Sequence, residues 1–189
     1  MKTIISIFFL LLISFSATTY PIDSAMAAGV TTQDIEVFHP YDSKTIAMGR
    51  ETFTYKTFRS DIGQTISQIE ITQPSEYEGL LLRKHILQSP ETIYIQSGEF
   101  EFVFSQSDQK FEVKEGNIVS VPAGFPFGFR HISKGEGKVL AISHSDALPK
   151  MLSEVGTPVA DAAIASKANK LDITKISSVA KKYGIEFLN

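Results

Sequence analysis

A two-residue alternation of apolar and polar side chains recurs in short runs between about residues 31 and 145. Side chains of a β-strand point alternately to its two faces, so such runs predict strands with one buried face. Turn residues separate the runs, as expected for antiparallel strands joined by short connections. The clearest runs are Glu51–Phe58, Gln64–Thr72, Glu91–Phe104 and Gly137–Ser145. We therefore expect an all-β domain, either a sandwich or a small barrel.

The period changes after residue 146. Apolar residues between 148 and 155 follow the three- and four-residue spacing of a helix, and those between 173 and 183 repeat it. Asp172 suits an N-cap, while Gly156 and Gly184 suit C-terminal ends. We predict a β-barrel over residues 28–146 and a helical extension over residues 147–189 that packs on it. A partner interface is the alternative role for the apolar stripes.

Residues 1–27 are predicted to be a cleaved signal peptide. Lys2 gives a positive start, Ile4–Ser16 is an apolar run too short to span a bilayer comfortably, and Ala25–Ala27 has the small-x-small pattern of a cleavage site. A buried or membrane-anchoring helix is the alternative. Cleavage there predicts an exported protein, periplasmic or secreted, with no stable membrane anchor.

Composition and charge exclude several classes of function. The formal net charge is −3, with both signs spread along the chain, which provides no clustered basic face for nucleic-acid binding. The chain has no cysteine, and this excludes disulfides, thiol catalysis and thiolate metal ligands. Any metal ion would have to be held by histidine and carboxylate side chains.

Two stretches place glycine, proline and polar residues at regular spacings. The first contains Gly79, His85, Leu87, Glu91 and Gly98, and the second contains Gly116, Pro122, Gly124, Phe127 and His131. In order and spacing they resemble the two motifs of the cupin superfamily, Gly-x5-His-x-His-x3–4-Glu-x6-Gly and Gly-x5-Pro-x-Gly-x2-His-x3-Asn. The tail YGIEFL (residues 183–188) resembles that of the quercetin-dioxygenase-like, single-domain branch. The resemblance implies a cupin barrel, which is a double-stranded β-helix or jelly roll, with C-terminal helices. It also implies a homodimer.

The sequence departs from the cupin pattern at the metal ligands. In that family the motif histidines and glutamate hold a divalent metal. His85 and Glu91 match the first histidine and the glutamate, whereas Leu87 and Phe127 replace the other two histidines. Leucine and phenylalanine have no lone pair to donate, and a catalytic metal site usually has at least three protein ligands. The intact family site is therefore not predicted.

A rebuilt metal site is the alternative. Outside the predicted signal peptide the histidines are His39, His85, His131 and His144. An iron, manganese, nickel, copper or zinc ion would need His85 and Glu91 together with His131 or His144. His131 lies four residues beyond the old ligand position, about 13 Å along a strand, so it cannot simply replace that ligand.

His85 and Glu91 are nevertheless the candidate functional residues. They could form a hydrogen-bonded pair inside the barrel that needs no metal, or they could perform general acid–base catalysis on a bound substrate. Leu87 and Phe127 make the interior apolar, as is common for small-molecule pockets. The predicted pocket residues are Leu87, Ile93, Phe127, Phe129 and His131.

Three functions remain open at this point. The favoured hypothesis is an exported cupin-domain protein that binds a small apolar or aromatic molecule in its barrel, with acid–base chemistry by His85 and Glu91. The second is a metal-dependent dioxygenase, as the resemblance implies, or an isomerase- or lyase-like cupin. The third is a non-catalytic structural or interaction module. If side chains such as Leu87, Phe127 and Ile93 fill the barrel, no ligand fits inside it.

Overall fold

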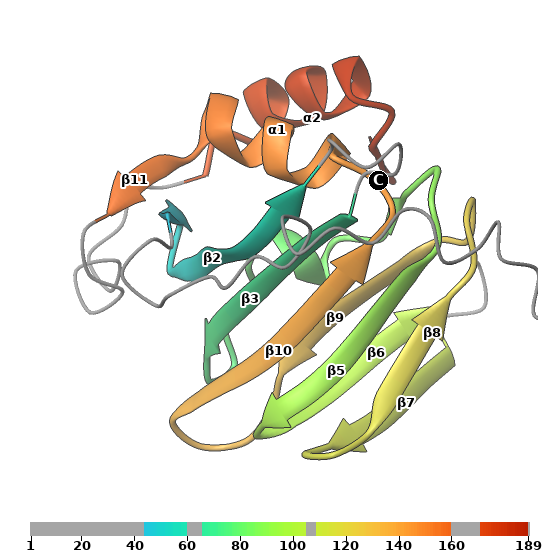
Figure 1. The fold of residues 1–189 in the computed structure, drawn as a ribbon. Coiled ribbons are helices and arrows are strands. Elements are labelled where there is room, and N and C mark those ends of the chain that lie inside the picture. Colours follow the sequence, from blue (N-terminus) through green and yellow to red (C-terminus); the bar gives the residue numbers. More distant parts are fainter. Residues whose placement is uncertain (1–43, 60–65, 105–108, 160–170, 189) are drawn as a thin grey trace, which may run out of the picture. The chain divides into compact units, whose positions relative to one another are not determined.

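The computed structural model describes residues 44–59, 66–104, 109–159 and 171–188 (Figure 1). The chain divides into two units, residues 1–37 and residues 38–189, and all described residues belong to the second unit. The predicted signal peptide, residues 1–27, lies outside the described residues and stays a prediction; His39 also lies outside them. In the part of the chain that is described, no helix is long and apolar enough to cross a membrane.

The described strands form two antiparallel sheets. A seven-stranded sheet has the order β11-β1-β2-β3-β10-β5-β8, and a five-stranded sheet has the order β12-β4-β9-β6-β7. The first contains β1 (Thr45–Met48), β2 (Glu51–Arg59), β3 (Ile66–Pro74), β5 (Glu91–Ser97), β8 (Ile118–Val121), β10 (Glu136–Ser143) and β11 (Thr157–Val159). The second contains β4 (His85–Ile86), β6 (Glu99–Phe104), β7 (Gln109–Lys114), β9 (Phe127–His131) and β12 (Glu186–Phe187).

The order of the central strands defines the fold. Strands β3 to β10, counted one to eight along the chain, lie as 1-8-3-6 in one sheet and 2-7-4-5 in the other. This is the strand order of a jelly roll, or double-stranded β-helix, in which successive strands repeatedly cross between two facing sheets. The predicted all-β fold, a jelly-roll barrel with C-terminal helices, is therefore confirmed.

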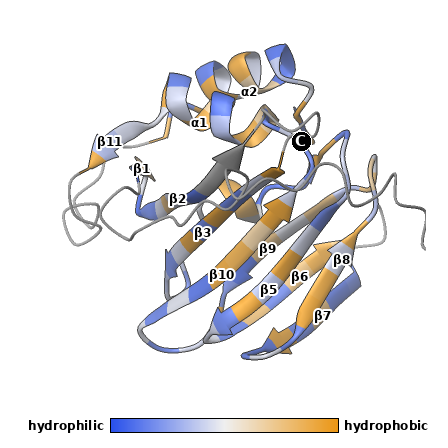
Figure 2. Ribbon diagram, in the orientation of Figure 1, coloured by the Kyte–Doolittle hydropathy of each residue, from blue (hydrophilic) through white to orange (hydrophobic). Residues whose placement is uncertain are grey.

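The alternation seen in the sequence places one face of each central strand in the core. Along both β3 and β10 every second residue is buried. Figure 2 shows the hydrophobic positions along the strands. Phe100, Phe102, Phe127 and Phe129 of the five-stranded sheet are almost completely buried, and so are apolar side chains of the facing sheet: Ile69, Ile71, Ile93, Ile95 and Val139. Burying each such side chain contributes about 1.5–3 kcal/mol.

The residues after 146 contain the predicted helices and two strands that the sequence did not reveal. Helix α1 (Ala147–Val155) packs against α2 (Ile173–Lys182), and the backbone N–H of Lys175 donates to the Asp172 carboxylate, so Asp172 caps α2 as expected. Strand β11 pairs with β1, and β12 pairs with β4. The extension therefore completes both sheets as well as adding helices.

Candidate functional site

His85 is held inside the barrel by aromatic rings. It lies on β4, where Phe127 of β9 is its partner on one side and Phe187 of β12 its partner on the other. The imidazole centroid lies 4.4 Å from that of Phe127, and the residue is only 4% exposed. Nδ1 donates to the carbonyl oxygen of Arg83 at 3.0 Å, which leaves Nε2 as the acceptor nitrogen. Burial lowers the pKa of His85 to about 4, so the ring is neutral at neutral pH.

Glu91 lies at the start of β5, at one end of the barrel. The strand register places it beside Ser143 of β10, which in turn lies beside Ser67 of β3. Glu91 is 5% exposed, and among the described residues no group donates a hydrogen bond to its carboxyl. Burial alone raises the pKa of this carboxyl to about 7.

The Glu91 carboxyl borders a small cavity, which we call the Glu91 cavity. Its volume is about 40 Å³. Hydroxyl, amide and apolar side chains share its wall: Ser67, Ile69, Leu87, Gln88, Ala141, Ser143, Ser145, Ala147, Leu148 and Tyr183. Of the predicted pocket residues, only Leu87 lines this cavity. Ile93, Phe127 and Phe129 belong to the packed core.

The structure does not join His85 to Glu91. The two residues lie on different sheets, and within the described ranges no hydrogen bond or ion pair connects them. The hypothesised pair is therefore not formed. Any chemistry at Glu91 would have to use the carboxyl without direct contact from the imidazole.

The residues present do not fit a divalent metal ion. Leu87 and Phe127, at the positions of two family ligands, are buried hydrocarbons. Among the described residues, no three histidine, aspartate or glutamate side chains lie close enough together to hold a metal ion. The Phe127 ring packs directly on His85 and so occupies one side of the imidazole. Transition metals need several nitrogen, oxygen or sulfur donors in a defined geometry, which this set does not supply.

The other histidines do not rebuild the site. His131 is completely buried, with Nε2 bonded to the Ser133 hydroxyl at 2.8 Å and its ring 5.2 Å from that of Phe100. Its backbone N–H donates to Gln73, which lies at the end of β3 opposite to Ser67. His144 is exposed to solvent. Neither residue lines the Glu91 cavity.

Sequence reasoning missed a second buried carboxylate, Glu51. Gln73 Nε2 donates to its Oε1 at 2.7 Å, and the Leu80 backbone N–H donates to its Oε2 at 2.9 Å. The Leu81 amide is a further donor, but burial outweighs all three and raises the pKa of Glu51 to about 7. A Cβ on Gly79 would overlap this carboxyl, which explains the first motif glycine. The burial of Glu51 could have been predicted, since Glu51 points to the same face of its strand as the core residue Phe53.

Within the described residues, the fold and site define a jelly-roll protein with a packed interior and a buried carboxyl, that of Glu91, that accepts no hydrogen bond from the chain. No protein-family model and no curated protein matches the sequence. Solved structures do match. One is the polyketide cyclase RemF from Streptomyces resistomycificus, with 19% identity over 58% of this chain and 78% of that chain and a TM-score of 0.47.

Two further matches come from other organisms. One is an RmlC-like cupin family protein with a double-stranded β-helix fold from Methanocaldococcus jannaschii, with 17% identity over 59% of this chain and 91% of that chain and a TM-score of 0.43. The other is hydroxypropylphosphonic acid epoxidase from S. wedmorenis, with 12% identity, a TM-score of 0.47 and coverage of 59% of this chain and 60% of that chain. The chain thus spans less than two thirds of the epoxidase. At these identities the likeness concerns the fold and says nothing of ligand or reaction.

Proposed function

We propose that this chain is a metal-independent, cupin-like binding protein whose Glu91 cavity takes the N–H group of a small molecule. The observation that supports this is the Glu91 carboxyl, which is buried, has no hydrogen-bond donor among the described residues and borders a cavity. Glu91 keeps 5% of its surface exposed, so either water or a ligand that enters the cavity can serve as the partner of this carboxyl. A donor supplied by a ligand would provide the missing partner and favour the ionised carboxylate.

The packed interior limits the size of the ligand. An aromatic molecule has no place among the Phe100, Phe102, Phe127 and Phe129 side chains, which fill the space between the sheets. A cavity of about 40 Å³ holds roughly three water molecules, so only a small group such as an amine or amide fits beside Glu91. The sequence favoured a small apolar or aromatic molecule inside the barrel. The proposal replaces that ligand with a small polar group at the end of the barrel.

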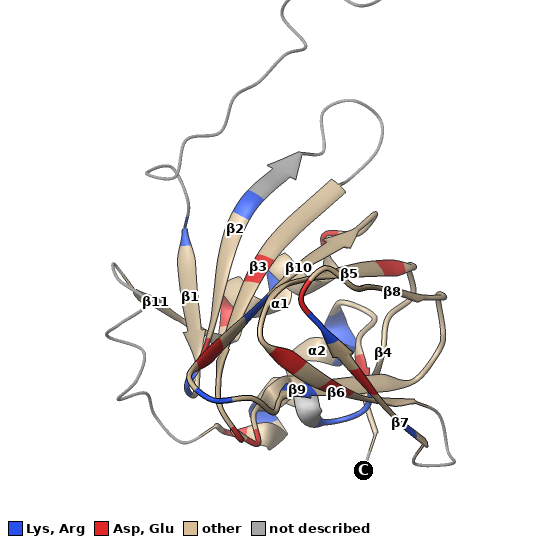
Figure 3. Ribbon diagram, turned by 90° about the horizontal axis from the view of Figure 1, so that it is seen from below, with Lys and Arg blue, Asp and Glu red and all other residues tan. Residues whose placement is uncertain are grey.

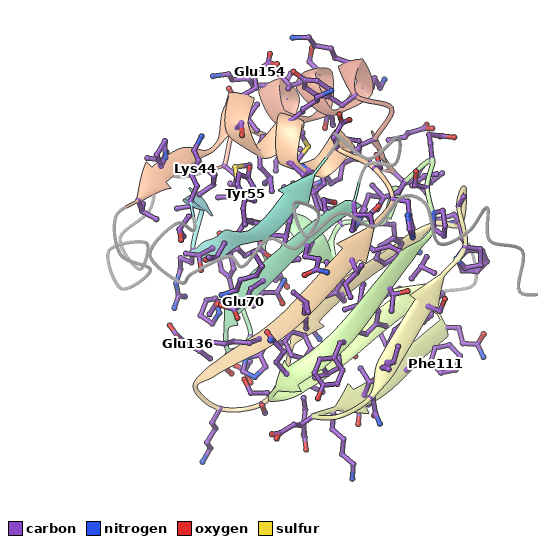
Figure 4. All side chains as sticks on the ribbon, viewed as in Figure 1. Lys44, Tyr55, Glu70, Phe111, Glu136 and Glu154 are labelled. Atoms are coloured by element: carbon purple, nitrogen blue, oxygen red, sulfur yellow. The ribbon has the colours of Figure 1, made fainter. Side chains whose placement is uncertain are left out.

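A larger ligand would extend outside the barrel. A groove of about 360 Å³ lies against α1, and Tyr183 borders both this groove and the Glu91 cavity. Figure 4 labels two of its lining residues, Tyr55 on β2 and Glu154 on α1. The Tyr183 hydroxyl donates to Glu154 at 2.7 Å, which holds the phenol ring in place. An amine with an apolar body could occupy the groove while its nitrogen reached toward Glu91.

Proton transfer is a second candidate function for the same carboxyl. A general base works best when its pKa lies near the operating pH, and burial brings the pKa of Glu91 to about 7. An activity whose pH profile has an inflection near 7, and which a Glu91→Gln variant lacks, would support this role. Metal-dependent oxygen chemistry is not proposed, because the donor set does not fit a metal.

Export is a separate part of the proposal. It follows from residues 1–27 of the sequence and places the protein in the periplasm or outside the cell. N-terminal sequencing of the protein made in a bacterial host should find a start near Ala28. An unprocessed start at Met1 in a cytoplasmic fraction would contradict export without affecting the binding proposal.

The binding proposal is tested by amide NMR on the purified protein with methylammonium and acetamide as probes. We expect millimolar methylammonium to shift the amide signals of Ser67, Glu91 and Ser143. The shifts should disappear in Glu91→Gln and persist in Glu136→Gln, which changes an exposed carboxylate at the other end of β10. No shift with either probe would contradict ligand binding and favour the structural module. Selective broadening around Glu91 by Mn²⁺ would contradict metal independence.

A further inference from the structure

The wall of the Glu91 cavity offers hydroxyl protons as well as the Glu91 acceptor. Ser143 of β10 lies directly opposite Glu91 of β5 and is 8% exposed, and its hydroxyl has no hydrogen-bond partner among the described residues. The Ser145 hydroxyl oxygen accepts from the Ala147 N–H at 3.1 Å, but no described group accepts the proton of that hydroxyl. The third serine, Ser67, donates its proton to the Ser145 carbonyl oxygen at 2.8 Å. Two of the three serine hydroxyls therefore have a proton to donate to a ligand.

The strand register brings an acceptor and a donor side by side. Side chains directly opposite each other on antiparallel strands have Cβ atoms about 4.5–5.5 Å apart. Glu91 and Ser143 are such a pair, and both line the cavity at the end of the barrel beside α1 and α2 (Figure 1). A single small group in the cavity can therefore contact both of them.

No cation faces Glu91 from the described strands around it. Glu91 is the only charged residue of β5, and β8 carries none (Figure 3). Glu70 on β3 and Glu136 and Lys138 on β10 alternate with the buried residues of those strands, so they point to the opposite face of the sheet. Of the residues that line the cavity, Tyr183 is the only other titratable one. An ammonium ion bound here would therefore have Glu91 alone to offset its loss of hydration.

A primary amide matches both sides of this arrangement. An ammonium group has hydrogen-bond donors only and a ketone has acceptors only, whereas a primary amide has two N–H donors and a carbonyl acceptor. It is also neutral, so it enters the cavity at a smaller desolvation cost than an ion. Its three heavy atoms equal the roughly three water molecules that a cavity of about 40 Å³ holds. The cavity is thus matched to an amide in hydrogen bonding, charge and size.

We propose that the Glu91 cavity binds the primary amide group of a small carboxamide, whose N–H donates to Glu91 and whose carbonyl oxygen accepts from the Ser143 hydroxyl. This inference rests on the proposed function and selects the chemical class of its ligand. The carbon chain that carries the amide then leads past Tyr183, which borders both the cavity and the groove against α1. Ligands of this class are uncharged carboxamides with a short or apolar body.

Three small probes separate the donor, the acceptor and the charge. Acetamide has both hydrogen-bonding functions, acetone has the shape of acetamide without its N–H donors, and methylammonium has donors and a charge without an acceptor. Titrations of the purified protein at pH 7, followed by amide NMR, measure the three affinities. We expect acetamide to bind about tenfold more tightly than either of the other probes, since each of these lacks one of the two hydrogen bonds.

A serine substitution tests the contact to the carbonyl oxygen of the ligand. Ser143→Ala removes the hydroxyl donor and should weaken acetamide binding about fivefold, while the affinity for methylammonium stays unchanged. Ser120→Ala, at an exposed position on β8, is the matched control and should change neither affinity. The amide spectrum of each variant without a probe shows whether the fold is intact. An intact Ser143→Ala variant that binds acetamide as tightly as the native chain would overturn the proposal.

The pH dependence tests the charge of the ligand independently. Burial raises the pKa of Glu91 to about 7, and methylammonium needs the ionised carboxylate, so its affinity should fall about tenfold from pH 8 to pH 6. The affinity for acetamide should change by less than about threefold, because a protonated Glu91 still accepts the N–H and can donate its own proton to the amide oxygen. An equal fall for acetamide would overturn the proposal.

The outcomes distinguish this inference from the proposed function. If methylammonium binds at least as tightly as acetamide and loses its site in Glu91→Gln, the proposed class of ligand is wrong and the Glu91 site remains. If none of the three probes shifts the signals of Glu91 and Ser143, both proposals fail, and water is the partner of this carboxyl.

Discussion

Two buried carboxyls at opposite ends of β3 provide a natural comparison. Glu51 lies beside Gln73 at one end, and Glu91 lies across β10 from Ser67 at the other. Gln73 lies six positions after Ser67, which corresponds to roughly 20 Å along a strand. Burial raises the pKa of both carboxyls to about 7. By this measure the two groups are indistinguishable.

The hydrogen-bond partners separate them. Glu51 accepts from Gln73 and from the backbone amides of Leu80 and Leu81, so it joins strands β2 and β3 to the turn before β4. Glu91 has no donor among the described residues and borders a cavity instead. A raised pKa thus reports burial, whereas the number of unmet hydrogen bonds shows which carboxyl remains available for a ligand.

The largest expected effect is at Glu51. Glu51→Ala should lower the free energy of unfolding by about 4 kcal/mol, because it leaves three buried donors without an acceptor, each at a cost of about 1–3 kcal/mol. Urea denaturation followed by circular dichroism measures this loss. Glu70→Ala, which removes a surface ion pair with Lys56, is the control and should cost about 1 kcal/mol or less. Equal losses in the two variants would show that the hydrogen bonds accepted by Glu51 do not stabilise the fold.

The fold could be predicted from the sequence because its signals are local. Alternation assigned the strands, and the paired motifs implied the jelly-roll order that the structure confirms. Strands β11 and β12 escaped prediction because they are only three and two residues long, and their pairing with β1 and β4 depends on distant parts of the chain. The hydrogen bonds to Glu51 could not be predicted for the same reason, since the donors lie 22 and 29 residues away along the chain.

The candidate site could be predicted only in part from the sequence. Spacing singled out His85 and Glu91, and both are buried. Strand parity states which face a side chain takes within one strand, but it does not state whether groups on two sheets touch. The strand at His85 is only two residues long, so parity could not be extended from it to Glu91. Ser67 and Ser143 of the cavity wall share strand parity with core residues of β3 and β10, so their inward direction could have been predicted. Their position beside Glu91 depends on the pairing of three strands, which the sequence does not state.

The next effect concerns Gly98, at the Gln73 end of the barrel. Its backbone has φ +87°, and a Cβ there would lie 2.7 Å from Nε2 of His131. We expect Gly98→Ala to cost about 3 kcal/mol, through backbone strain and overpacking. Gly116→Ala is a matched control, since Gly116 has φ +85° but no atom within 4 Å of the added Cβ, and it should cost about 1 kcal/mol. Equal costs in urea denaturation would show that His131 is not packed against this glycine.

The smallest expected change in the free energy of unfolding is a gain in place of a loss, and it concerns Glu91. The folded-state pKa of about 7 exceeds the ordinary value of 4.5, so the native state holds the proton more tightly. The contribution of this carboxyl to stability is complete below about pH 4.5 and is lost as the pH rises through 7. Glutamine does not titrate, so Glu91→Gln should gain stability relative to the native chain as the pH rises. We expect a gain of about 1 kcal/mol at pH 8, less than the full linkage, because a buried amide also lacks a partner.

Urea denaturation of Glu91→Gln at pH 5 and pH 8 checks both the sign and the pH range. His85, whose pKa is lowered to about 4, and Glu51 titrate in both proteins, so their contributions cancel in the difference. Glu51→Gln under the same conditions should lose stability, because its amide replaces an acceptor oxygen with a donor that faces other donors. The Glu→Gln substitution would then change stability in opposite directions at two sites that lie near opposite ends of β3. Destabilisation by Glu91→Gln at pH 8 would instead mean that the native chain supplies Glu91 with a partner, and the case for a ligand there would fail.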